Sequence, residues 1–322
     1  QWVTGVQTCA LPIFYMNADL VCEGGGVKGV ALAGAITYLQ EHGYEFKKIA
    51  GNSAGAIFAS LVAVGYTGYE LKEISFALDF KNFMDKTSLS KIPLAGPFLS
   101  IVKNKGIFKG DALEKFMEEK LKAKGKTQFK DISINGTSPL KIITADSTRK
   151  ELVVLPDDLV KYNIDPLNFS IAKAVRMSIS IPFIFKPILI EDNDKSSFMV
   201  DGGLISNFPV WLFDVEGIPR WPTFGLRLKS DDEDNFTAAK DTGLLKYLFN
   251  IIDTAISSNE EAYLNNKDSI RTIDIPTFDI STLDFYISKE KKEKLFNSGY
   301  NSAKEFLDKW NFNIYVENYR NN

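Results

Sequence analysis

The chain has 322 residues and a mass of 36.0 kDa, which is enough for one large hydrophobic core. Its net charge of −3 and isoelectric point near 5.5 argue against a nucleic-acid-binding protein, because such proteins are usually basic. No segment approaches the run of about 18 apolar residues that a membrane-spanning helix needs. Any contact with a membrane is therefore expected to be peripheral.

The first fourteen or fifteen residues differ in character from the rest of the chain. They lack the basic start of a secretory signal peptide. Met16 is followed directly by an apolar run and a glycine-rich turn, and it has the position of a natural first residue. We interpret residues 1–15 as a non-native leader. Neither a signal peptide nor a membrane-spanning helix is predicted. We therefore expect a cytoplasmic protein that contacts a membrane at most peripherally.

The elements that follow alternate between strands and helices. Residues 20–22 predict a buried strand that ends in a glycine turn, and residues 27–40 carry apolar side chains at helical spacing. Residues 48–50 predict a second strand, and residues 56–64 predict an apolar helix after a tight turn. This order predicts an α/β fold with right-handed crossovers between parallel strands.

The remainder of the chain continues this mixture. Further strands are expected at residues 140–145, 152–155, 198–200 and 223–228, and further helices at residues 69–80, 111–124, 171–177, 244–265 and 289–310. Residues 92–108 hold proline, glycine and apolar residues without a clear period, which suggests a cover over a site. Residues 230–235 predict an acidic surface loop.

The segment Gly-Asn-Ser-Ala-Gly at residues 51–55 matches G-x-S-x-G, the nucleophile elbow. Such a turn holds a serine hydroxyl out between a strand and a helix, and it leaves room only for small neighbours such as Gly51 and Gly55. A helix N-terminus at Ser53 would also stabilise a developing alkoxide. The alternative is that Ser53 merely caps the helix, since serine is a preferred N-cap residue.

Gly24, Gly26 and Gly29 form a G-x-G-x-x-G pattern between the first strand and helix, so a dinucleotide site has to be considered. Such a site needs a carboxylate at the end of the second strand, and here that strand ends at Ala50 without one. We therefore expect no nucleotide. The alternative is an oxyanion hole, in which consecutive backbone N–H groups converge on a tetrahedral intermediate.

Lys28 lies in the first turn of the helix that follows the glycines, where a positive charge is mildly unfavourable. This placement suggests that Lys28 serves a bound phosphate or the oxyanion. An exposed lysine without a function is the alternative.

A nucleophilic serine needs a proton acceptor within hydrogen-bonding reach. His42, the single histidine, precedes the serine and lies near a helix end, where histidine commonly contacts the last carbonyl groups. We expect it to be structural. Asp201, in Asp-Gly-Gly after an apolar run, is the other candidate, although an Asp-Gly pair is also an ordinary hairpin turn.

The glycine turn, the serine elbow and Asp-Gly-Gly, in this order, resemble the patatin-like phospholipase family. The resemblance covers roughly residues 20–213 and includes the segments at residues 174–185 and 201–209. It implies a three-layer α/β/α fold with a central, mostly parallel sheet. It also implies a catalytic domain over residues 17–215, on which residues 216–322 would pack as a C-terminal part of the same domain.

The resemblance further implies calcium-independent hydrolysis of phospholipids or other acyl esters through a Ser53–Asp201 dyad and an acyl-enzyme. Asn207 would be structural, bracing the loop after Asp201. The oxyanion hole would comprise Gly24, Gly25, Gly26 and Lys28, and the elbow glycines would be Gly51 and Gly55.

No cofactor and no metal are expected, because one histidine and two cysteines, Cys9 and Cys22, show no metal-ligand spacing. The expected partner is a lipid or acyl-ester substrate, with no nucleic acid. Three alternatives remain: a histidine-dependent α/β-hydrolase, a non-catalytic lipid-binding protein of the same fold, and an esterase for small esters.

Overall fold

The computed structural model describes four stretches of chain and two isolated residues, namely 16–93, 95–192, 195–230, 266–319, 251 and 254. The leader, nearly all of the helix expected at residues 244–265 and all but the first residue of the acidic loop lie outside the described residues.

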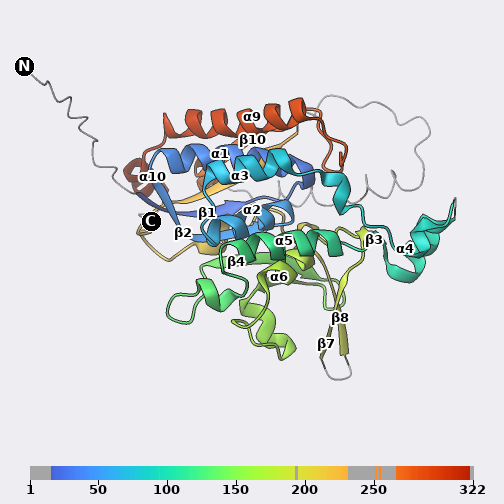
Figure 1. The fold of residues 1–322 in the computed structure, drawn as a ribbon. Helices are drawn as coiled ribbons and strands as arrows, with labels where there is room; N and C mark the ends of the chain where they lie inside the picture. Colours follow the sequence, from blue (N-terminus) through green and yellow to red (C-terminus); the bar gives the residue numbers. More distant parts are fainter. Residues whose placement is uncertain are drawn as a thin grey trace, which may run out of the picture.

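One central sheet organises the described chain (Figure 1). Its strand order is β10-β9-β1-β2-β4-β8-β7, and β5 pairs with β4. The strands β10, β9, β1, β2 and β4 run parallel, whereas β8, β7 and β5 add antiparallel pairs on one side. The bounds are β1 Met16–Cys22, β2 Tyr44–Asn52, β4 Leu140–Asp146, β5 Glu151–Leu155, β7 Ile188–Asp192, β8 Lys195–Asp201, β9 Thr223–Lys229 and β10 Thr272–Pro276.

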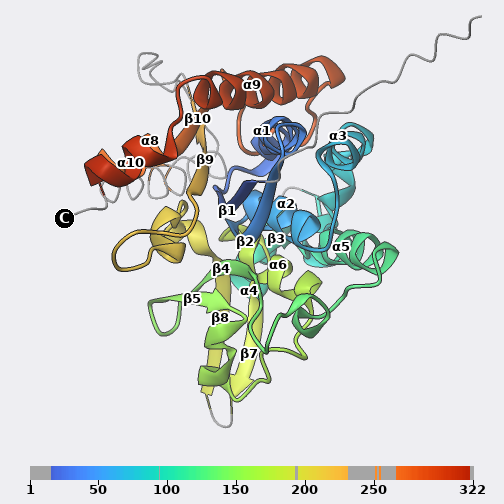
Figure 2. The ribbon, with the colours of Figure 1, turned by 90° about the vertical axis from the view of Figure 1, so that its left-hand side faces the viewer.

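Helices flank this sheet, and α1 and α9 lie side by side over it in both ribbon views (Figures 1 and 2). Glycine allows their close approach, because a Cβ at Gly34 or Gly299 would lie 2.0 or 1.8 Å from a carbonyl oxygen of the other helix. The helices are α1 Val30–Glu41, α2 Ala54–Ala63, α3 Gly68–Ala77, α4 Gly96–Asn104, α5 Asp111–Ala123, α6 Ile171–Ser178, α8 Asn266–Ile270, α9 Lys289–Leu307 and α10 Phe312–Tyr319.

The other face of the sheet carries Val21 and Ala50. They pack against Phe208, Val210 and Phe213, from the segment after β8 that ends in a 3₁₀ turn. Strands β9 and β10, from the part of the chain beyond residue 215, join the same sheet beside β1.

The predicted α/β fold, with a central, mostly parallel sheet flanked by helices, is therefore confirmed, as are the six predicted strands and the predicted helices within the described chain. The interpretation of residues 92–108 as irregular was wrong. They contain the amphipathic helix α4 and the strand β3 (Gly106–Phe108), which pairs with β6 (Phe183–Phe185) in a separate two-stranded sheet.

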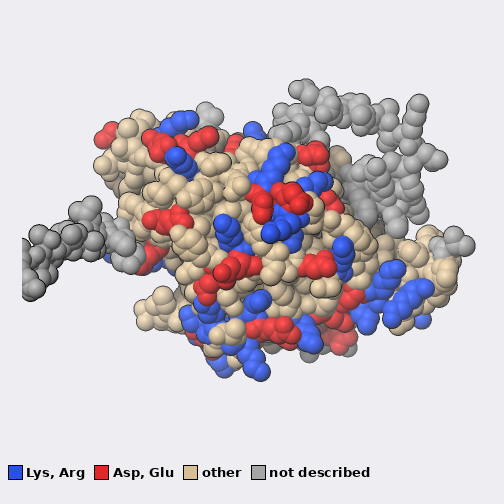
Figure 3. Space-filling model, turned by 45° about the horizontal axis from the view of Figure 1, so that its top comes forward, with Lys and Arg blue, Asp and Glu red and all other residues tan. Residues whose placement is uncertain are grey.

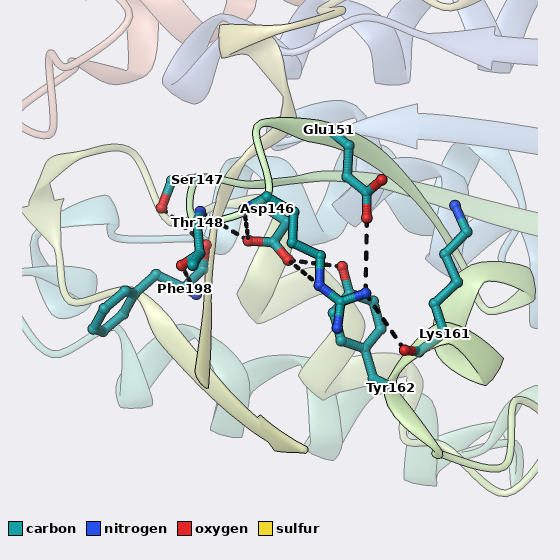
Figure 4. A network of polar contacts seen from close by, with 8 residues as sticks. Asp146, Ser147, Thr148, Glu151, Lys161, Tyr162 and Phe198 are labelled. Atoms are coloured by element: carbon teal, nitrogen blue, oxygen red, sulfur yellow. Dashed lines mark hydrogen bonds and ion pairs between the residues drawn. The ribbon is translucent and has the colours of Figure 1, made fainter. Parts of the chain in front are cut away.

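A buried carboxylate fixes the connection between β4 and β5 (Figure 4). Asp146 Oδ1 accepts hydrogen bonds from the backbone N–H groups of Thr148 and Arg149 at 2.9 and 3.0 Å, and its Oδ2 accepts one from the Tyr162 hydroxyl at 2.9 Å. Burial would raise the pKa of Asp146, but its hydrogen bonds together outweigh burial and lower it. Asp146 also pairs with Met199, which places β8 in its register.

Candidate active site

Ser53 follows β2 directly and begins α2 in a strained conformation. Its φ of 51° and ψ of −123° are rare for a residue with a side chain, as the nucleophile elbow requires. The turn is so tight that a Cβ at Gly51 would lie 2.3 Å from the Gly55 oxygen. A Cβ at Gly55 would lie 2.2 Å from the Cys22 oxygen. Both expected elbow glycines are therefore sterically required.

The side chain of Ser178, at the end of α6, holds the elbow in place. Its Oγ accepts a hydrogen bond from the Ser53 backbone N–H at 2.8 Å and donates one to the carbonyl of Ile143 at 2.5 Å. The Ser53 side chain does not cap its own helix. The alternative interpretation of Ser53 as a simple N-cap therefore does not describe this turn.

Sheet register brings Asp201 to Ser53 across 148 residues of sequence. On β4, Ile143 pairs with Asn52 of the parallel strand β2, and the next residue, Thr144, pairs with Asp201 of the antiparallel strand β8. Because β8 runs in the opposite direction to β2, the C-terminal ends of the two strands face each other over β4. Both Ser53 and Asp201 are buried.

One oxygen of the Asp201 carboxylate is held by its surroundings and the other is not. Oδ1 accepts hydrogen bonds from the Gly203 backbone N–H at 2.9 Å and from Asn52 Nδ2 at 3.2 Å. Oδ2 is buried and makes no hydrogen bond of normal length and angle within the described chain, although the Ser53 side chain is near enough to limit the rise in the pKa of the carboxyl group that burial causes. A buried carboxylate oxygen without a partner is rare in folded proteins and points to a function.

Burial raises the pKa of Asp201 to about 6. The Ser53 side chain, the Gly203 N–H and the Asn52 amide all favour the charged form and limit this rise. At neutral pH the group is therefore ionised, yet it is a stronger base than an ordinary aspartate with a pKa near 4.

Side-chain amides connect Asp201 with the glycine turn. Asn52 Nδ2 also donates to Asn207 Oδ1 at 2.8 Å. Asn207 Nδ2 donates in turn to Glu23 Oε1 and to the Gly24 carbonyl, both at 3.4 Å. Asn207 was expected to brace the loop after Asp201, and its side chain joins the serine elbow to the glycine turn.

The glycine turn lies beside Ser53. A Cβ at Gly24 would meet the Asn207 side chain at 2.4 Å and the Cβ of Ser53 at 3.0 Å. Gly26 has a φ of +55°, and a Cβ there would lie 2.1 Å from the Thr282 oxygen. The Gly24 N–H makes a long hydrogen bond of 3.5 Å to the Asn207 carbonyl. Larger side chains are therefore excluded from this turn.

Ser53 and Gly26 line the same cavity, and the other lining residues are almost all apolar. They come from α2, α5 and β6, from the turn before α1, from the segment after α6, and from segments that precede α5 and α9, namely Val27, Ala54, Ile57, Phe80, Phe83, Leu113, Ile179, Ile181, Phe185, Thr282, Leu283 and Phe285. Such a lining suits a hydrocarbon chain better than a polar ligand.

Two residues singled out in the sequence lie apart from this cavity. Lys28 Nζ donates a hydrogen bond to Ser230 Oγ at 2.7 Å, and Lys28 is not among the lining residues. His42 Nδ1 lies 2.8 Å from the Tyr38 carbonyl oxygen, and its ring stacks on that of Tyr38 at 3.9 Å. His42 therefore has the helix-end position that the sequence predicted.

Within the described ranges, no group of three or more His, Cys, Asp or Glu residues is arranged to hold a metal ion. No helix in the described part of the chain is both long and apolar enough to cross a membrane.

Sequence reasoning missed three residues of the site. Asn52 was only the variable position of G-x-S-x-G, Glu23 only the residue before the glycines, and Ser178 only one member of a segment that resembled the family. All three lie within or beside recognised sequence segments. Their contacts could not be predicted, because these depend on the register of the sheet.

Comparisons with known proteins identify a family for this chain. A family model described as Patatin-like phospholipase matches residues 20–214. The Bacillus subtilis (strain 168) protein YqhO is 36% identical over 92% of this chain and 100% of its own length. The protein named Probable lipid hydrolase 463L, from Invertebrate iridescent virus 6, is 28% identical over 62% of this chain and 63% of its own.

Solved structures show the same fold. VipD from Legionella pneumophila superposes with a TM-score of 0.53 and 21% identity, covering 91% of this chain and 67% of that one. ExoU of Pseudomonas aeruginosa, in its complex with SpcU, superposes with a TM-score of 0.50 and 20% identity, covering 92% of this chain and 52% of that one.

Proposed function

This chain belongs to the patatin-like phospholipase family, and we propose that it is a lipid acyl hydrolase in which Ser53 is the nucleophile and Asp201 the general base. The observation that carries the proposal is the buried Asp201 Oδ2, which makes no hydrogen bond of normal geometry in the described chain and belongs to a carboxyl group whose pKa burial raises and the Ser53 side chain lowers. The match to a protein named as a lipid hydrolase supports the substrate class.

In the proposed reaction, Asp201 accepts the hydroxyl proton of Ser53 while Oγ attacks the ester carbonyl. The tetrahedral intermediate collapses, and the leaving alcohol takes the proton back from Asp201. Water, deprotonated by the same carboxylate, then attacks the acyl-enzyme, releases the fatty acid and restores Ser53. Held at a fixed position by Asn52 and Gly203, Asp201 needs no reorientation between these steps.

The negative charge on the intermediate would be stabilised by backbone N–H groups of the glycine turn. Gly25 and Gly26 are the better donors in this proposal, because the Gly24 N–H already reaches toward the Asn207 carbonyl. Lys28 would meet a substrate phosphate only after leaving Ser230. The apolar cavity beside Ser53 would hold the acyl chain.

The first test compares wild type with Ser53→Ala on a short-chain p-nitrophenyl ester and on phosphatidylcholine vesicles. We expect release of product from both by wild type and a loss of at least about 10³ in kcat in the variant. A fluorophosphonate should label wild type at Ser53 and leave Ser53→Ala unlabelled. His42→Ala should retain activity. Absence of turnover and of labelling in folded wild type would favour the lipid-binding alternative.

A further inference from the structure

The helix α4 presents apolar side chains to solvent on one face. Phe98, Leu99 and Val102 are exposed by 58%, 42% and 65%. Because Phe98 and Val102 are four residues apart and Leu99 and Val102 are three apart, the three side chains lie on the same face. Ile92, just before the helix, is 44% exposed. Soluble proteins seldom expose such residues together without a partner.

The helix is anchored, so this exposure does not come from a loose segment. Ser100 is buried on the opposite face, where its Oγ donates to the Gly106 carbonyl at 2.6 Å and contacts Thr87 Oγ1 at 2.6 Å. Ile101 packs against the small apolar cluster that includes Ile181 and Phe185. The apolar face is therefore held outward by contacts on the inner side.

The segment that contains α4 carries only positive charge. Residues 86–109 contain no Asp or Glu, although the whole chain has a net charge of −3. All lysines of this segment are exposed, namely Lys86, Lys91, Lys103, Lys105 and Lys109. In Figure 3, basic and uncharged atoms predominate at the right-hand end of the molecule, where Figure 1 places α4.

The helix also connects to the active-site cavity. The cluster against which Ile101 packs shares Ile181, Phe185 and Leu283 with the lining of the cavity beside Ser53. Apolar side chains thus connect Ile101 on the inner side of α4 with the lining of the cavity beside the nucleophile.

From this we propose that the α4 face, consisting of Ile92, Phe98, Leu99 and Val102 with its surrounding lysines, docks the protein on an anionic phospholipid bilayer. A helix with aromatic and aliphatic residues on one side and lysines beside them lies in the plane of a membrane interface. Lysines near an anionic surface add attraction that salt screens. The inference rests on the proposed function, since docking here would deliver an acyl chain to the cavity of Ser53.

The test is co-sedimentation of the full chain carrying Ser53→Ala, which prevents vesicle hydrolysis. We expect it to bind phosphatidylcholine vesicles containing phosphatidylglycerol, less so at high salt, and to bind pure phosphatidylcholine weakly. Phe98→Ser with Val102→Ser should lower the partition coefficient at least about tenfold. Lys103→Glu with Lys105→Glu should abolish the preference for the anionic lipid. Val160→Ser, which alters another exposed apolar residue, and Lys115→Glu with Lys122→Glu should bind normally.

Unchanged binding by both α4 variants would overturn the proposal. So would a dimer that Phe98→Ser with Val102→Ser dissociates, since a second copy would then cover the face. Activity on a soluble ester separates this inference from the proposed function. For this measurement the α4 substitutions are made in the protein that retains Ser53. We expect these variants to cleave the p-nitrophenyl ester like wild type while losing activity on anionic vesicles. If wild type lacks ester activity, the proposed function fails while the binding measurement still decides the docking surface.

Discussion

Asn52 Nδ2 lies 3.2 Å from Oδ1 of Asp201, so the residue immediately before the nucleophile holds the base. We predict that Asn52→Ala lowers kcat about 10- to 100-fold with a smaller effect on KM, because the reacting groups lose their alignment. It should also move the acidic limb of the pH profile upward, since the Asn52 hydrogen bond lowers the pKa of Asp201. Steady-state kinetics across pH measures both effects. A fall in activity with an unmoved acidic limb would contradict the contact.

The pKa of about 6 predicts the pH dependence of the wild-type reaction. The base must be ionised, so kcat/KM should rise with pH through about 6 and level off above it. Soluble-ester hydrolysis, measured over a pH range in which the protein stays folded, checks this expectation. A rise in kcat/KM near pH 4 would mean that burial does not raise the pKa of Asp201. A kcat/KM that does not change with pH would exclude Asp201 as the base.

The same burial predicts that the base destabilises the fold. The pKa of Asp201 is raised from 3.8 to about 6 on folding, so its contribution to stability is present at low pH and is lost as pH rises between these values. Asp201→Asn should therefore stabilise the protein by roughly 2–3 kcal/mol above pH 6 and should give little gain below pH 4. Urea unfolding of both proteins at several pH values tests this. Substitution of the exposed Glu118 by Gln serves as the control. An equal gain in stability from Asp201→Asn at all pH values would contradict the prediction.

Ser178 is predicted to maintain the strained elbow. Ser178→Ala leaves the buried Ser53 N–H without its acceptor, which should cost about 1–3 kcal/mol of stability and lower kcat. Ser60 on α2 offers a matched control, because its buried hydroxyl has no hydrogen-bond partner in the described chain. Ser60→Ala should retain both stability and activity. Similar losses of stability and activity in the two variants would mean that removing any buried hydroxyl near the elbow has this effect, whether or not it contacts Ser53.

Asp146 is predicted to stabilise the β4–β5 connection. Asp146→Ala should cost about 2–4 kcal/mol, because it removes a buried acceptor of several hydrogen bonds, and Tyr162→Phe should cost less. The lowered pKa of Asp146 means that its stabilising effect is present at neutral pH and is lost as acid protonates it below its ordinary pKa. Thermal or urea unfolding measures these changes. Glu151→Ala, which removes only a 4.0 Å surface ion pair with Arg149, should change stability little.

Local sequence patterns predicted most of the fold near the site. Small residues around Ser53 indicated a tight turn, and the elbow can form because residue 55 is a glycine, where a Cβ would overlap the Cys22 carbonyl oxygen. Apolar runs likewise predicted β1, β2, β4 and β8. These features depend on short-range sterics and burial, which neighbouring residues determine.

What the sequence did not predict depends on distant pairing. The contacts of Asn52 with Asp201 and of Ser178 with Ser53 require β4 to pair with strands from different parts of the chain. The raised pKa of Asp201 depends on burial in the assembled core, which the local Asp-Gly-Gly pattern does not predict. Helix α4 was missed because Pro97 and Gly96 suggested irregular structure, although both lie at its start, where they are tolerated.

The pairing of β4 with both β2 and β8 fixes the positions of the two strand ends that carry the reactive groups. Side chains alternate between the faces of a sheet, so a slip of β8 by one residue would turn Asp201 away from Ser53 altogether. A change of register would therefore displace the base in whole-residue steps. Loops at the far ends of β2 and β8 can change in length without altering it, provided that the pairs Asn52–Ile143 and Thr144–Asp201 persist.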